Sequence, residues 1–82
     1  MVQELLTLDT GDVIAHTLAF DKTTKLLAVG SSDAEIKLIN TEKGEVSSAL
    51  KGHDHAVTSV YFSHDNTALY SAGNDGTVRV WK

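Results

Sequence analysis

The chain has 82 residues, a formal net charge of −4 and no cysteine. A domain this small buries only about 60% of the surface of its unfolded chain. Without cysteine it has no disulfide and no thiolate metal ligand, and its acidic balance argues against nucleic-acid binding. No apolar run is long enough to cross a membrane, and the acidic N-terminus does not resemble a signal peptide. We therefore expect the cytoplasm or the nucleus as its compartment.

Short strand patterns separated by turn residues run along the whole chain. No window shows helical periodicity with capping residues, and the Asp75-Gly76 pair is a strong hairpin signal. The sequence therefore predicts an all-β fold. In chain order the expected strands are 2–8, 13–20, 25–31, 34–39, 45–50, 56–62, 68–72 and 77–81.

The two halves of the chain repeat one pattern at a fixed offset. Phe62, Leu69 and Asp75 each have the same residue type 42 positions earlier, without any gap. A period of about 40–45 residues with several strands in each copy is typical of a β-propeller blade. The sequence predicts a single unit of two blades, each of four antiparallel strands. Residues 10–51 form the first blade, 52–82 the second, and 1–9 an outer strand for a neighbouring blade.

The order of the strands leaves the second blade without its own fourth strand. An outer strand donated by another copy would complete it, through Val2, Leu5, Leu6 and Leu8. At least about three repeats are needed to cover the apolar faces of blades, so we expect sister chains to close the ring. Propellers have about 4–8 blades, and four chains are preferred over three. The alternative is that the chain is a fragment of a longer propeller protein.

Four residues of the second repeat carry a family resemblance. The Gly52-His53 pair precedes a strand, Ser71 lies in the next strand, Asp75 lies in a turn, and Trp81 ends the following strand. With these residues the chain resembles the WD-repeat β-propeller family, strongly from 50 to 82 and moderately from 13 to 48. The resemblance implies a hydrogen-bonded network that runs from Asp75 to His53, Ser71 and Trp81.

The first repeat departs from that pattern. It keeps Asp33, but Gly11, Val29 and Ile39 stand where the network would need His, Ser and Trp. We expect this blade to depend on apolar packing instead. The side chains of Tyr61 and Tyr70 are expected to pack between neighbouring blades.

The resemblance implies a non-enzymatic scaffold that binds a protein or peptide of unknown identity, with no cofactor. Partners of the family usually bind the face that carries the Gly-His loop, which here presents Ser32, His55 and Asn74. Two other functions remain open. His53 and His55 alternate as metal ligands do, so a ring that binds a metal or small molecule is one alternative, and a purely structural module is another. A Ser/His/Asp catalytic set can also be named, but it coincides with the implied network and lacks oxyanion donors.

Overall fold

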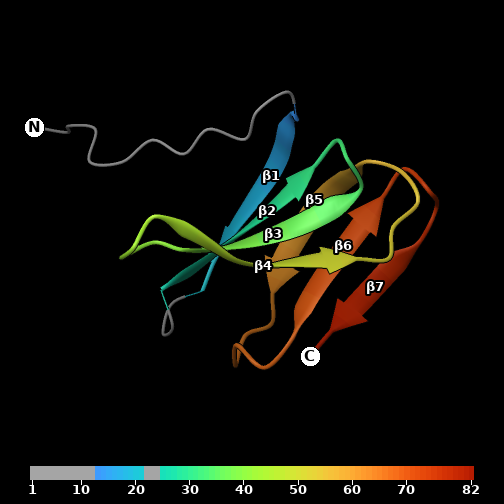
Figure 1. Cartoon of the computed structure of the whole chain (residues 1–82). Coiled ribbons are helices and arrows are strands. Elements are labelled where there is room, and N and C mark those ends of the chain that lie inside the picture. Colours follow the sequence, from blue (N-terminus) through green and yellow to red (C-terminus); the bar gives the residue numbers. More distant parts are fainter. Residues whose placement is uncertain (1–12, 22–24) are drawn as a thin grey trace, which may run out of the picture.

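The computed structural model describes residues 13–21 and 25–82. They form two antiparallel sheets and no helix, so the all-β prediction is confirmed for this part of the chain (Figure 1). It follows that no described helix could cross a membrane. The expected strand 2–8 lies outside the described residues. The strands are β1 (Ala15–Phe20), β2 (Leu26–Ser31), β3 (Glu35–Asn40), β4 (Glu45–Lys51), β5 (Val57–Phe62), β6 (Leu69–Gly73) and β7 (Val78–Trp81).

Each sheet follows the order of the chain. The first sheet has the strand order β1-β2-β3-β4 and the second has the order β5-β6-β7. Every connection within a sheet is a hairpin (Figure 1). Gly44 and Gly76 have φ values of 68° and 78° in two of these connections, a region that glycine enters at little cost. The expected strands that fall within the described residues all form, with ends that differ by one or two residues.

The start of β1 shows why such ends shift. The expected strand began at residue 13, whereas β1 begins at Ala15. Ile14 donates its N–H to the Ser32 hydroxyl at 2.9 Å and accepts the N–H of Ser32 at 2.9 Å. These bonds satisfy the backbone of Ile14 from a loop rather than from a ladder partner.

The two sheets repeat the same pairing, 42 residues apart. Phe20 lies opposite Leu27 in the first sheet, as Phe62 lies opposite Leu69 in the second. The register shift between Ala15 and Thr17 also recurs, between Val57 and Ser59. Residues 42 positions apart therefore occupy the same strand position in the two sheets and lie on the corresponding face.

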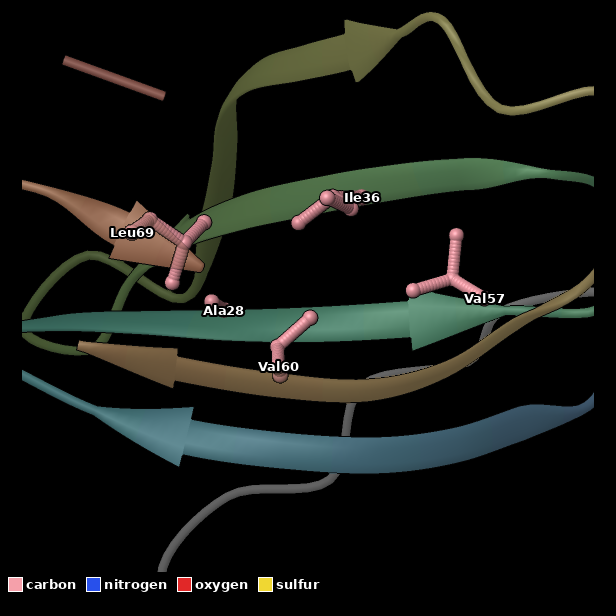
Figure 2. Close-up of a cluster of buried hydrophobic side chains, with 5 residues drawn as sticks. All are labelled: Ala28, Ile36, Val57, Val60 and Leu69. Carbon is pink, nitrogen blue, oxygen red and sulfur yellow. The ribbon is translucent and has the colours of Figure 1, made fainter. Parts of the chain in front are cut away.

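The core lies between the sheets. Figure 2 shows Ala28 and Ile36 of the first sheet directed toward Val57, Val60 and Leu69 of the second. The sheets approach one another most closely where β1 and β2 meet β5. Burial of these side chains stabilises the pair of sheets by about 25 cal/mol for each Å² of apolar surface removed from water.

Each sheet also has a side that no described residue of the other sheet covers. Leu18 and Phe20 lie on the outer face of the first sheet, and both are more than half exposed. Tyr61 and Tyr70 lie on the opposite side of the molecule, 68% and 40% exposed. The two tyrosines thus do not pack between the two described sheets, because strand alternation directs them away from that interface.

Candidate functional site: a hydrogen-bonded network in the second sheet

Four side chains of the second sheet and its loops form one row of hydrogen bonds. The Trp81 indole donates from Nε1 to Ser71 Oγ at 2.9 Å. Ser71 Oγ lies 2.7 Å from Nε2 of His53. Nδ1 of His53 lies 3.0 Å from Oδ2 of Asp75. The structure therefore brings together the four residues that the sequence pattern associates.

The sheet geometry explains how distant residues meet. Leu69 lies opposite Trp81, and Ser71 is two residues further along β6, so Ser71 and Trp81 are diagonal neighbours on one face. His53 comes from the loop between β4 and β5, and Asp75 from the turn between β6 and β7. The network thus ties a loop and a turn to the middle of the sheet.

A count of donors and acceptors assigns the protons. The Trp81 indole can only donate, and an ionised Asp75 can only accept. Ser71 accepts from Trp81 and donates its proton to Nε2 of His53. Nδ1 of His53 then carries a proton and donates it to Asp75. This tautomer, which we assign from the bonding pattern, satisfies every side chain of the row, and a completed buried network of this kind is stabilising.

The Asp75 carboxylate is the anchor of the network. The Thr77 hydroxyl donates to Oδ1 at 2.7 Å, and the Asp54 N–H donates to Oδ2 at 3.0 Å. These bonds, with smaller contributions from the Thr77 N–H and His53, hold the pKa of Asp75 far below its ordinary value, although desolvation acts in the opposite direction. Asp75 therefore stays ionised and fixes the loop and the turn to one another.

Thr77 and Gly73 also belong to the site, although the sequence analysis did not single them out. The Thr77 hydroxyl lies 3.3 Å from Nδ1 of His53 as well. A Cβ added to Gly73 would lie 2.9 Å from Nδ1 of His53 and 3.0 Å from the Ala56 carbonyl oxygen. Only glycine leaves room for the imidazole. The signal in the sequence is that the first repeat, which has Gly11 in place of the network histidine, has Ser31 at the position equivalent to Gly73.

The first sheet has an apolar row in place of the network. Val29 and Ile39, which replace Ser and Trp, are both buried. Asp33 instead accepts from Lys37 Nζ at 2.9 Å and from the Glu35 N–H at 3.2 Å. Burial pushes the pKa of Asp33 upward, but these two partners outweigh it and leave the pKa below its ordinary value. The expected dependence of this repeat on apolar packing agrees with this arrangement.

The three candidate partner-binding residues lie at one end of the sheets. Ser32 is in the β2–β3 connection, His55 in the β4–β5 connection and Asn74 in the β6–β7 connection, and all three are exposed (Figure 1). The Asn74 N–H donates to the Ala56 carbonyl at 2.9 Å. The network residues His53 and Asp75 are neighbours of His55 and Asn74 in sequence, so they hold these two loops in place.

Ser71, His53 and Asp75 share the connectivity of a hydrolytic triad. Ser71 is only 2% exposed, and its hydroxyl is already bonded to Trp81. A substrate could not reach Ser71 Oγ without opening the sheet. Both ring nitrogens of His53 are likewise engaged, and residues 13–21 and 25–82 contain no group of three His, Cys, Asp or Glu able to hold a metal ion.

Two adjacent antiparallel sheets with an Asp–His–Ser–Trp network define the class of WD-repeat blades. The family model described as "WD domain, G-beta repeat" matches residues 44–82. The chain therefore belongs to the WD-repeat family.

Curated relatives agree with this membership. WD repeat-containing protein 91 of Gallus gallus is 33% identical over 82 residues, which are 99% of this chain and 11% of that protein. Periodic tryptophan protein 2 of Arabidopsis thaliana is 38% identical over 66 residues, or 80% of this chain and 7% of that protein. Nuclear distribution protein nudF of Aspergillus flavus is 39% identical over 69 residues, or 82% of this chain and 15% of that protein. The chain thus spans a small part of the length of these relatives.

Proposed function

We propose that this chain is a non-enzymatic protein-interaction scaffold that presents Ser32, His55 and Asn74 to a protein or peptide. WD repeats generally mediate protein–protein interaction, and the family membership supports this reading. The observation that carries it is that Asp75 bonds both His53 and the Asp54 N–H. The loops are thus ordered before any partner binds, which lowers the entropic cost of binding. We place this activity in the cytoplasm or the nucleus.

The scaffold is completed, we further propose, when copies of the chain close a ring head to tail. The second sheet leaves one apolar side uncovered, and Leu18 and Phe20 on the outer face of the first sheet are more than half exposed. The second sheet also has three described strands where the first has four. A strand from a neighbouring copy, with Val2, Leu5, Leu6 and Leu8, would pair with β7. A heterologous interface of this kind ends when the rotation closes, with four copies preferred over three.

A second candidate is that the chain is one part of a longer propeller. The observation that favours it is the size of the relatives, of which the chain matches between 3% and 15%. In that case further repeats of the same polypeptide would cover the uncovered sides. The loops with Ser32, His55 and Asn74 would present the same surface in either arrangement.

The mass of the native particle distinguishes the two arrangements. Light scattering on the 82-residue chain should give a multiple of 8.8 kDa if copies close the ring. A particle of one chain that melts cooperatively would contradict self-assembly, and an aggregated, poorly folded chain would favour the longer propeller.

Partner binding has its own test. Peptides selected from a display library against the assembled chain should lose affinity when Ser32, His55 and Asn74 are all replaced by Ala. The matched control replaces Glu42, Lys43 and His64, which are exposed in the turns at the opposite end. Peptides that respond equally to the two triple variants would contradict the proposed binding face.

A further inference from the structure

The second sheet has an uncovered apolar face on the side away from the first sheet. We call this the open face. Tyr61 lies opposite Tyr70, which lies opposite Val80, so these three form one row across the sheet. Tyr61 is 68% exposed, Val78 is 76% exposed and Val80 is 57% exposed. Four large apolar side chains on one side of a sheet mark an interaction surface rather than scattered exposure. The open face consists of Tyr61, Tyr70, Val78 and Val80.

The repeat identifies the kind of surface that fits the open face. Its residues are the equivalents, 42 positions on, of Ala19, Ala28, Ile36 and Leu38 of the first sheet. In the first sheet that face packs against the second sheet. The open face is therefore the unoccupied equivalent of an interface that the molecule already makes once.

The complementary surface is present on the same chain. Val60, Phe62 and Leu69 of the second sheet pack toward the first sheet, and their equivalents are Leu18, Phe20 and Leu27. Leu18 and Phe20 lie on the outer face of the first sheet, where they are 63% and 59% exposed. One chain thus carries both halves of a second interface on opposite sides, and a second copy can supply the half that each side lacks.

The open face and the outer face of the first sheet would not pack as the two sheets of one chain do. We call the contact between those two sheets the internal interface. On the strands nearest the other sheet, Ala19 and Ala28 of the internal interface are replaced by Tyr61 and Tyr70. On the next strand outward, Ile36 and Leu38 are replaced by the smaller Val78 and Val80. Interiors pack at close to crystal density, so the sheets must separate where side chains are larger. An interface between copies would therefore be thicker along its inner strands and thinner toward the outside.

This difference in thickness would reduce the angle between the two sheets that meet at the interface between copies. The two sheets of one chain are closest where β1 and β2 meet β5, and larger side chains at that end would make a pair of sheets more parallel. An eight-bladed ring needs an average of about 45° for each blade, and a six-bladed ring about 60°. A smaller angle between copies thus favours four chains.

From these observations, and on the basis of the self-assembly proposed above, we infer that the open face binds the outer face of the first sheet of a second copy. Tyr61 and Tyr70 act there as spacers that set the ring at four chains. Their role is one of packing volume, and the hydroxyl groups are not needed for it.

Two double variants test the spacer role in the full chain. Tyr61→Ala with Tyr70→Ala restores the small residues of the internal interface, and native mass spectrometry should show three chains in place of four. Tyr61→Phe with Tyr70→Phe is the matched control. It keeps the volume of the two aromatic side chains, so the assembly should still contain four chains. Circular dichroism confirms that each variant keeps its sheet content.

Each result separates the spacer role from the assembly itself. An alanine double variant that stays at four chains, or that dissociates, overturns the spacer role, while the wild-type assembly still stands. A wild-type ring of three overturns the spacer role alone, and a wild-type monomer overturns the proposed self-assembly as well. Leu18→Asp places a charge in the opposite half of the interface and should prevent formation of the wild-type assembly. If this variant assembles as the wild type does, the outer face is not the partner of the open face.

Discussion

A Cβ on Gly73 would stand 2.9 Å from Nδ1 of His53, closer than a Cβ atom comes to a non-bonded neighbour in real proteins. The imidazole fills this space and connects Asp75 to Ser71. The hydrogen-bonded network therefore depends on the absence of a side chain as much as on the four side chains that make it.

Gly73→Ala is expected to destabilise the chain by about 1–3 kcal/mol, the usual cost of forcing extra volume into a packed site. Urea unfolding at one fixed chain concentration measures the change, because assembly makes stability concentration-dependent. The matched background is His53→Ala, in which the imidazole is absent. Gly73→Ala should cost much less in that background. An equal cost in the two backgrounds would show that the Ala56 carbonyl, and not His53, makes the conflict.

Trp81→Phe keeps an aromatic ring but removes the N–H that Ser71 accepts at 2.9 Å. Ser71→Ala removes the acceptor and leaves the indole N–H without its partner, which costs about 1–3 kcal/mol for a buried group. The double variant should be less destabilised than the sum of the single variants, by about 0.5–3 kcal/mol. Equilibrium unfolding of the four proteins gives this coupling, and strict additivity would mean that the bond contributes nothing.

The stability of the chain should fall in acid. Because the pKa of Asp75 is lowered in the folded chain, its contribution is complete above the ordinary Asp pKa of about 3.9 and is lost as the pH falls below that value. Asp33 and Asp65, whose pKa values are also lowered, contribute in the same direction.

Asp75→Asn should therefore flatten the loss of stability below about pH 5. The matched control for the loss of one negative charge is Asp54→Asn, which removes an exposed carboxylate beside the network. Thermal unfolding from pH 3 to pH 7 measures both variants. If Asp75→Asn has the same pH dependence as the wild type, Asp75 is not the group whose protonation weakens the fold.

Removal of residues 1–9 is expected to abolish ring assembly, because these residues would supply the strand that pairs with β7 of another copy. Size-exclusion chromatography with light scattering should then give particles smaller than the wild-type ring. A variant in which residues 1–9 are replaced by a polar sequence of equal length separates the loss of Val2, Leu5, Leu6 and Leu8 from a change in length. A truncated chain that forms the wild-type ring would show that this segment has no part in closure.

The members of the network could be found from sequence because each occupies a distinctive place relative to the strands. His53 precedes a strand, Asp75 lies in a glycine-containing turn and Trp81 ends a strand. Thr77 and Gly73 could not be found in this way. Their importance comes from contacts between segments distant in sequence, such as the 3.3 Å approach of the Thr77 hydroxyl to His53.

The tyrosines show a different limit. Alternation along β5 and β6 indicates that Tyr61 and Tyr70 lie on the face opposite Val60 and Leu69, but it does not indicate which face meets the other sheet. The structure shows that Val60 and Leu69 do so. The interpretation of the tyrosines as packing between blades therefore fails for the two described sheets and continues only as a proposal for the open face.

The positions of the strands and the 42-residue repeat were determined by the sequence alone, because alternation and turn residues act over a few neighbouring positions. The tertiary structure decided which faces are buried, because the two sides of a strand carry similar apolar residues and only the contact between sheets distinguishes them. That contact buries one face of each sheet and leaves Leu18 and Tyr61 exposed on opposite sides of the molecule.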